Sequence, residues 1–428
     1  MPAAQDFIQL HIFGRTDNAY RWSGETDVFE ALASVESRYR IDPRRIVLRG
    51  FSMGGAGAWH LGLHHPGRWA AVEAGAGFTE TIRYARLQPP YPEAALRIYD
   101  AVDYARNAVN LPIVGYGGDE DPQLQASVNI REQLAREDVG PDLRALFLVG
   151  PKIGHKWHPD SQRESDRFLD ASLPQRVPDR VRFVTYTTRY NTCFWITVEA
   201  LQQHYQRAEV DASRGGEIRT RNVARLRLDA RQDYLIDQQK VHGDVFEKTG
   251  GRWKPAGPLR GLRKIHGLQG PIDDAFRDSF LCVKPARGPY PVLDLFAAEY
   301  AKWLRADPRI QVDASAADIA AHHLVLFGDP WSNPLIARVL PKLPLTWTRE
   351  VIALAGRRFP ASDHYVALIY PNPLNPARYV VLNSGHTFGE KEFRGTNALL
   401  YPRLGDWAVI RIRDGLPAAT GYFDDFWR

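Results

Sequence analysis

Residues 49–58 read "RGFSMGGAGA", and Ser52 stands at the centre of a G-x-S-x-G pattern within them. The apolar run "RIVLRG" (45–50) predicts a short buried strand before the serine, and a helix is predicted after it. A sharp strand-to-helix turn exposes its serine, and small residues such as Gly50 and Gly54 let helix and strand pass closely. Ser52 is therefore either a nucleophile or a serine that serves only the turn, and the nucleophile is favoured.

Strands and helices alternate on both sides of this turn throughout residues 1–172. The predicted strands cover residues 7–14, 45–50, 69–78, 111–118 and 143–150, and the predicted helices cover 26–39, the stretch after Ser52, 125–137 and 161–173. Strands separated by helices predict a mostly parallel sheet with helices on both faces. Functional side chains of such sheets lie at the carboxyl ends of the strands.

The residues after 172 have a different pattern of predicted strands and helices. We therefore expect the 428-residue chain to form two or three domains. Residues 173–180, "LPQRVPDR", contain two prolines and no periodicity, and we interpret them as a linker. Residues 181–428 are predicted to form a β-rich, mixed α/β accessory domain, with a Gly-Gly hairpin at 250–251. The pattern of predicted strands and helices changes near residue 285, so the alternative is that this region forms two subdomains divided there.

Composition excludes several classes of function. The net charge of +5 comes from scattered arginines without a basic, aromatic-interleaved run, which argues against a nucleic-acid partner. No apolar run is long enough for a membrane span, and the first residues do not have the pattern of a signal peptide. The two cysteines, Cys193 and Cys282, form no zinc-type cluster, although one disulfide between them is left open. The sequence does not indicate the oligomeric state.

A serine hydroxyl becomes a nucleophile when a base lies within hydrogen-bond reach and an acid orients that base. The predicted strand 111–118 ends in Asp119-Glu120-Asp121, and we predict Asp121 as the acid. Asp119 and Glu120 are alternatives because one residue of register is beyond sequence interpretation, and Glu73 is a more distant alternative.

The predicted strand 143–150 is followed by His155, which we predict as the base. His158 is expected to cap or line the closing helix, and the histidines on the helix after Ser52 are expected to be packing or surface groups; they are His60, His64 and His65. Serine, acid and histidine thus follow three strands in the chain order of the α/β-hydrolases.

Residues 1–172 resemble the α/β-hydrolase superfamily. The phrases "GETDVFEAL", "YRIDPRRIVLRGFSMGGAGAWHLGLHHPGRWAAV" and "IGHKWHPD" are similar to prolyl-oligopeptidase-like (S9-type) serine esterases and peptidases. The resemblance implies a serine hydrolase with Ser52, Asp121 and His155 as its triad, and it leaves ester or peptide open. The phrases "GPIDDAFRDSFLCV" and "YPNPLNPARYVVLNSGHTF" are similar to the C-terminal part of multidomain members.

The chain departs from the family pattern before residue 45, where the superfamily has several strands and a loop that often carries His-Gly. That loop supplies one backbone N–H of the oxyanion hole, and the N–H of Met53 supplies the other. Only one strand, 7–14, is predicted upstream here. We expect that the reading frame begins further upstream; the alternative is a degenerate protein that lacks half of the site.

Two further stretches contain candidate binding residues, on weaker evidence from the sequence. Asn18, Tyr20 and Trp22 follow the first predicted strand, so they either line a substrate pocket or belong to an ordinary polar loop. The stretch "FGDPWSNP" (327–334) ends a strand and opens a helix, which suits an anion. We favour the simpler role for it, in which Ser332 or Asn333 is a helix N-cap.

The sequence therefore predicts an α/β-hydrolase-like fold, incomplete at its N-terminus, followed by a β-rich accessory domain. The predicted function is hydrolysis of a small-molecule carboxylic ester through an acyl-enzyme, without metal or organic cofactor. An S9-type peptidase is an alternative, although no propeller repeat is visible. A non-catalytic hydrolase-like scaffold is the alternative from another class.

Overall fold

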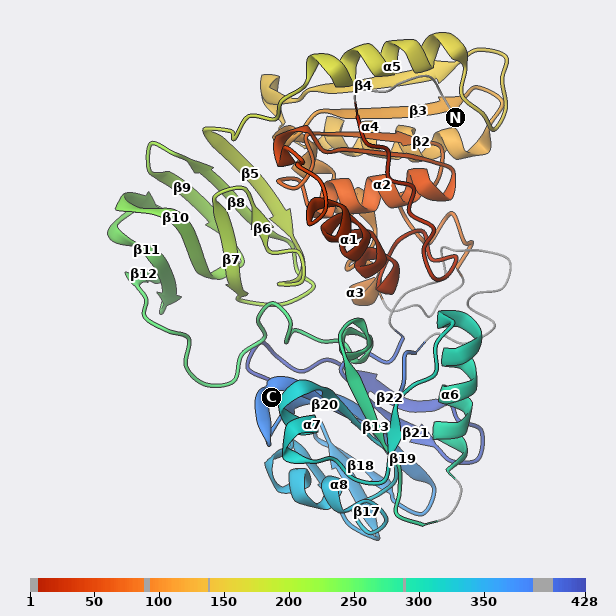
Figure 1. Ribbon diagram of the computed structural model, residues 1–428. Coiled ribbons are helices and arrows are strands. Elements are labelled where there is room, and N and C mark those ends of the chain that lie inside the picture. Colours follow the sequence, from red (N-terminus) through yellow and green to blue (C-terminus); the bar gives the residue numbers. More distant parts are fainter. Residues whose placement is uncertain (1–6, 88–92, 138, 288–289, 388–402) are drawn as a thin grey trace.

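The computed structural model describes residues 7–87, 93–137, 139–287, 290–387 and 403–428. Figure 1 shows three parts that follow one another along the chain. An α/β part comes first, a largely antiparallel sheet with one parallel pair of strands follows it, and a mixed α/β part comes last. A connecting segment leads from the second part to a short 3₁₀ helix, Ile272–Arg277, with which the third part begins.

The first part confirms the predicted parallel sheet. Its strands are β1 (Val47–Phe51), β2 (Ala71–Gly75), β3 (Ile113–Gly118) and β4 (Ala145–Gly150), which pair in the order β1-β2-β3-β4, all parallel. The helices are α1 (Ser23–Glu36), α2 (Met53–His64), α3 (Glu93–Leu96), α4 (Gln125–Arg136) and α5 (Pro159–Ala171), with a 3₁₀ helix at Ala101–Asn110. Helix α5 packs on one face of the sheet, and α2 and α4 pack on the other.

The prediction of a buried strand at residues 7–14 is wrong. The segment forms no strand, and Phe7 and Phe13 are 61% and 89% exposed. A strand needs a neighbouring backbone as its hydrogen-bond partner. Among the described residues, β1 pairs with β2 alone, and no strand pairs with residues 7–14. The β-prone side chains of this segment therefore have no sheet in which to pack.

The second part is an eight-stranded sheet with its own core. Its strands are β5 (Arg180–Thr185), β6 (Thr192–Cys193), β7 (Ile196–Leu201), β8 (Ala208–Ser213), β9 (Glu217–Arg221), β10 (Val223–Ile236), β11 (Gln239–Thr249) and β12 (Arg252–Pro255). The main path is β12-β11-β10-β9-β8-β5, and β7 pairs with both β6 and β10. Gly250 and Gly251 join β11 to β12 with positive φ angles, so the predicted hairpin is present.

The third part holds a seven-stranded sheet with the order β14-β13-β15-β20-β19-β21-β22 and a three-stranded sheet, β16-β17-β18. The strands are β13 (Phe280–Val283), β14 (Ile310–Gln311), β15 (His323–Leu326), β16 (Leu345–Trp347), β17 (Val351–Leu354), β18 (Arg357–Pro360), β19 (His364–Asn372), β20 (Asn375–Leu382), β21 (Trp407–Arg411) and β22 (Pro417–Gly421). The helices are α6 (Pro291–Leu304), α7 (Ala316–Ala321) and α8 (Pro334–Val339). The region after residue 180 is thus β-rich with mixed sheets, as predicted.

Cys193 of β6 and Cys282 of β13 lie in different hydrophobic cores, and both thiols are free. In the described part of the chain, none of the helices combines the length and the apolar character that a membrane crossing requires.

Candidate active site

Ser52 lies at the sharp turn between β1 and α2, at the N-cap position of the helix. Its φ angle is +59°, a strained conformation for a residue with a side chain. The turn is closed by the Ser52 N–H, which donates to the Gly75 carbonyl at 2.9 Å. A Cβ on Gly50 would lie 2.0 Å from the Gly54 carbonyl oxygen, and one on Gly55 would lie 2.1 Å from that of Gly75. These glycines therefore allow the close approach that the sequence pattern predicts.

The structure brings Ser52, His155 and Asp121 together. The Nε2 atom of His155 lies 2.8 Å from the Ser52 Oγ atom, and its Nδ1 atom lies 2.8 Å from Oδ2 of Asp121. The three residues follow the carboxyl ends of β1, β4 and β3, which lie along the same edge of one parallel sheet. A carboxylate can only accept, so the imidazole carries its proton on Nδ1 and offers an Nε2 lone pair to the serine hydroxyl.

Asp121 is buried, whereas the His155 side chain is 42% exposed. The other carboxylate oxygen of Asp121, Oδ1, accepts from the backbone N–H of Gln123 at 2.9 Å. Both oxygens of this buried acid are thus bound, which fixes its orientation toward the imidazole. The side-chain carbonyl of Gln123 accepts in turn from the Gly77 N–H at 2.8 Å. This hydrogen bond connects the loop that carries Asp121 to Gly77, which packs against the backbone of Ser52.

Among the alternative acids, Glu120 is exposed, and Asp119 and Glu73 have other partners. Asp119 accepts from the N–H groups of Lys152 and Ile153, and these hydrogen bonds lower the pKa of its carboxyl. Glu73 is buried and paired with Arg49 through two hydrogen bonds of 3.1 and 2.8 Å. Asp121 is therefore the carboxylate that meets His155.

The remaining histidines have structural surroundings. His158 caps α5, since its Nδ1 accepts from the Asp160 N–H at 3.3 Å. His60 and His64 are buried on α2, where burial, the largest effect, lowers the pKa of His60 to about 4. His65, one residue beyond α2, packs edge-on against Tyr190.

The predicted pocket residues Asn18 and Trp22 are buried, and Tyr20 is half-buried. The amide of Asn18 donates to the Ser23 hydroxyl, Tyr20 donates to the Ile12 carbonyl at 3.0 Å, and the Trp22 indole donates to the Asp273 carbonyl at 2.8 Å. The alternative that these three residues line a substrate pocket stays a prediction. Their polar groups are engaged inside the protein because the loop folds inward against α2 and the third part.

Met53 is the first residue of α2. Its N–H is therefore one of the first-turn N–H groups that have no hydrogen-bond partner within the helix. Its side chain packs against a small cluster of Ala19, Ala56 and Phe78. This packing places the N-terminal loop and residues 78–85 beside the Ser52 turn.

Sequence reasoning missed the aromatic residues around His155. The Phe51 ring lies 4.9 Å from the His155 ring, and Trp157 stacks on Tyr116 with ring centroids 3.9 Å apart. Both Phe51 and Trp157 are sequence neighbours of predicted site residues, which is the signal that could have identified them.

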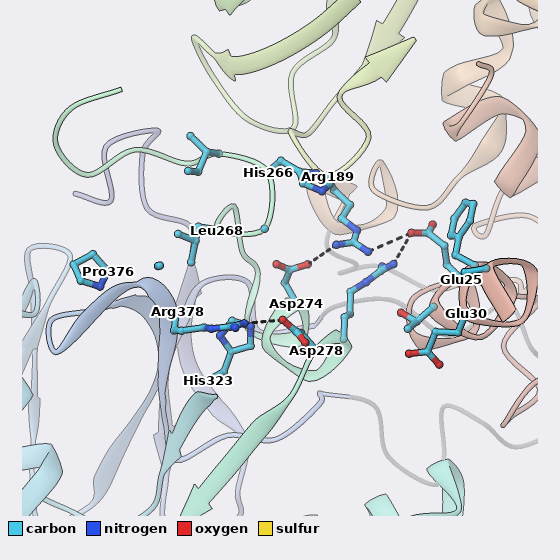
Figure 2. Close-up of a pocket in the computed structure, with 17 residues that line it drawn as sticks. Glu25, Glu30, Arg189, His266, Leu268, Asp274, Asp278, His323, Pro376 and Arg378 are labelled. Carbon is cyan, nitrogen blue, oxygen red and sulfur yellow. Dashed lines mark hydrogen bonds and ion pairs between the residues drawn. The ribbon is translucent and has the colours of Figure 1, made fainter. Parts of the chain in front are cut away.

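A separate cavity of about 860 Å³ lies at the junction of the three parts (Figure 2). Glu25 of α1 binds Arg189 of the second part and Arg277 of the third, and Asp278 binds Arg378 at 2.8 Å. Ser52 and its two partners do not line this cavity.

The stretch at 327–334 contains the N-cap of helix α8, which is the role that we favoured from the sequence. The Asn333 side chain accepts from the Leu335 N–H at 3.0 Å. Among the described residues, no group of three or more acidic, histidine or cysteine side chains could hold a metal ion.

Residues 16–179 match a family model described as "Putative esterase". A comparison with curated proteins gives no match. Solved structures with local similarity include a ferulic acid esterase, which is 22% identical over 35% of this chain and 60% of its own, with a TM-score of 0.28. An S-formylglutathione hydrolase from Agrobacterium tumefaciens is 22% identical over 36% of this chain and 58% of its own, with a TM-score of 0.30.

The first part has an α/β-hydrolase-like architecture, a parallel sheet with helices on both faces, and the family match covers the residues that include Ser52, Asp121 and His155. The chain spans 60% of the length of the ferulic acid esterase. The match supports a hydrolase that acts on esters, and the expected S9-type placement stays a prediction.

Proposed function

We propose that this protein is a serine carboxylesterase whose catalytic triad is Ser52, His155 and Asp121. The observation that carries the proposal is the continuous hydrogen-bond chain Asp121–His155–Ser52, with both contacts at 2.8 Å. Three residues from separate strand ends meet in the arrangement that activates a serine. The match to an esterase family model over residues 16–179 supports ester over amide as the substrate class.

In the proposed mechanism, Nε2 of His155 removes the hydroxyl proton of Ser52 while Oγ attacks the ester carbonyl carbon. Asp121 accepts the Nδ1–H throughout and stabilises the imidazolium. The N–H of Met53, at the positive end of α2, donates to the developing oxyanion. The tetrahedral intermediate then collapses, the alcohol leaves with the proton from His155, and an acyl-enzyme remains.

Deacylation repeats these steps with water as the nucleophile. His155 removes a proton from the water, the hydroxide attacks the acyl carbon, and the carboxylic acid leaves as Ser52 regains its proton. Every proton transfer uses the same Nε2 atom, so one imidazole acts as base and acid in both half-reactions. The His155 side chain is 42% exposed, so water has access to the imidazole.

The test compares the wild-type chain with Ser52→Ala and with Ser37→Ala, an exposed serine at the end of α1. We expect p-nitrophenyl acyl esters to be hydrolysed, a fluorophosphonate probe to label the protein, and both activities to survive in Ser37→Ala. In Ser52→Ala, labelling should vanish and kcat should fall by at least about 10³-fold. Full turnover by Ser52→Ala would refute the proposal. Alanine and proline p-nitroanilides test the peptidase alternative, and hydrolysis of them in preference to esters would replace esterase by peptidase.

A further inference from the structure

The loop that carries His155, residues 151–158, is held on both sides of the histidine by side chains from one neighbouring unit. That unit is β3 with the turn after it, which also carries Asp121. Tyr116 lies in β3 and Asp119 begins the turn. Neither side chain bonds to the imidazole; both bond to the backbone of its loop.

On the N-terminal side of the histidine, the Asp119 carboxylate accepts from two consecutive N–H groups. The Lys152 N–H donates to Oδ2 at 2.9 Å, and the Ile153 N–H donates to Oδ1 at 3.1 Å. Lys152 has a φ of +54°, which is unfavourable for a residue with a Cβ. The carboxylate thus stabilises a strained turn that directly precedes Gly154 and His155, and the same hydrogen bonds lower the pKa of the Asp119 carboxyl.

On the C-terminal side, the Tyr116 hydroxyl holds two peptide groups at once. It donates to the Lys156 carbonyl at 2.8 Å and accepts from the His158 N–H at 2.8 Å. The Tyr116 ring is buried and lies nearly parallel to the Trp157 ring, at an angle of 13°. Residues 156–158 therefore wrap around one side chain of β3, and both their direction and their distance from the sheet are fixed.

We propose that Tyr116 and Asp119 are positioning residues that set the place of the His155 imidazole between Ser52 and Asp121. The inference rests on the proposed esterase function. One strand unit then holds the base at three points: Asp121 binds the ring, Asp119 binds the backbone before it, and Tyr116 binds the backbone after it. A displacement of about 1 Å in a catalytic group can cost about 10²-fold in rate, so both backbone contacts bear on turnover.

The experiment uses two near-isosteric variants, Tyr116→Phe and Asp119→Asn, with Glu120→Gln as the matched control. Glu120 is exposed in the same turn, and among the described residues its side chain has no hydrogen bond or ion pair. We expect kcat for a p-nitrophenyl ester to fall by about 10- to 100-fold in both variants while KM changes less than about 2-fold. The control should keep wild-type kinetics.

The pH profile separates positioning from loss of stability. When the imidazole moves away from Asp121, the carboxylate stabilises the imidazolium less, so the acid limb of kcat/KM should move to lower pH in both variants. Loss of folded protein alone would lower the Tm and leave the shape of the profile unchanged, and that outcome would overturn the inference. So would wild-type kcat in both variants. If Ser52→Ala also kept its activity, the proposed function would fail instead, so the two failures are distinguishable.

Discussion

The side-chain amide of Asn107 bonds to both backbone groups of Val184. Its Nδ2 donates to the Val184 carbonyl at 2.9 Å, and its Oδ1 accepts from the Val184 N–H at 2.7 Å. Asn110 makes the same pair of contacts with Arg182. Strand β8 occupies one edge of β5, and these two asparagines occupy the other. A 3₁₀ helix of the first part thus substitutes for a neighbouring strand and joins the first two parts.

Replacement of Asn107 by Asp tests this junction. A carboxylate cannot donate to the carbonyls of Val184 and Leu63, which the amide now reaches at 2.9 and 2.8 Å, and it would bring a charge into a buried site. Each unsatisfied buried group costs about 1–3 kcal/mol, so we expect the free energy of unfolding to fall by at least about 2 kcal/mol. Urea denaturation measures it. Gln202→Ala, at an exposed site of the second part, should stay within about 0.5 kcal/mol of wild type.

Replacement of Asp121 by Asn tests the acid of the proposed triad. The amide can present its NH₂ group to Nδ1, which favours the imidazole tautomer with the proton on Nε2, where it cannot receive the serine proton. In a serine protease this change costs about 10⁴-fold in kcat, and we expect a loss of similar order here with little change in KM. Steady-state kinetics on a p-nitrophenyl ester provide the measurement. A smaller loss than in Asp119→Asn would identify Asp119 as the more important carboxylate.

Replacement of Glu25 by Gln tests the junction of all three parts (Figure 2). Burial alone would raise the pKa of Glu25, but Arg277, His65 and His60 together hold that pKa well below its ordinary value of 4.5. Loss of one partner from a buried ion pair costs about 3–5 kcal/mol, so the variant should be less stable at pH 7 by that order.

The pH dependence of the Glu25 variant has a definite sign. A lowered carboxyl pKa adds stability that is complete above pH 4.5 and disappears as the pH falls through the folded-state pKa. The difference in unfolding free energy between wild type and Glu25→Gln should therefore be constant above pH 5 and shrink below about pH 4.5. A constant difference down to pH 3 would contradict the role of the ionised carboxylate.

Asp273 gives the opposite pH dependence. Burial, the largest effect, raises its pKa to about 7, although Thr387 donates to both carboxylate oxygens through its N–H and its hydroxyl. Between pH 4 and 7 the unfolded chain loses this proton while the folded chain keeps it, so ionisation disfavours folding as the pH rises. Asp273→Asn should become increasingly more stable than wild type over that range and then level off. Thermal unfolding at a series of pH values measures the difference.

Sequence patterns predicted the first part well where strands are short apolar runs separated by amphipathic helices. All four strands of its sheet correspond to such runs, and Ser52, Asp121 and His155 follow three of them. The segment 7–14 has an equally β-prone composition and forms no strand. Composition measures how readily a segment enters a sheet, and it carries no information on whether a partner backbone lies beside it.

The choice among neighbouring carboxylates was equally beyond the sequence. Asp119 and Asp121 are two residues apart in one turn, and only the folded turn directs one toward the imidazole and the other toward the backbone of Lys152 and Ile153. Asn18 and Trp22 illustrate the same limit, because a polar loop after a predicted strand can fold inward. The Trp22 indole, for example, donates to the carbonyl of Asp273, more than 200 positions away along the chain.

The sequence by itself determined the alternation of strands and helices, the glycine-lined turn at Ser52 and the order in which serine, acid and histidine follow their strands. These features are local, since they depend on periodicity and on the steric freedom of a few adjacent residues. The tertiary structure alone decided which carboxylate meets His155, how Tyr116 and Asp119 hold its loop, and how Glu25 joins three parts. Each of these depends on side chains from distant segments, whose distances and burial exist only after the chain has folded.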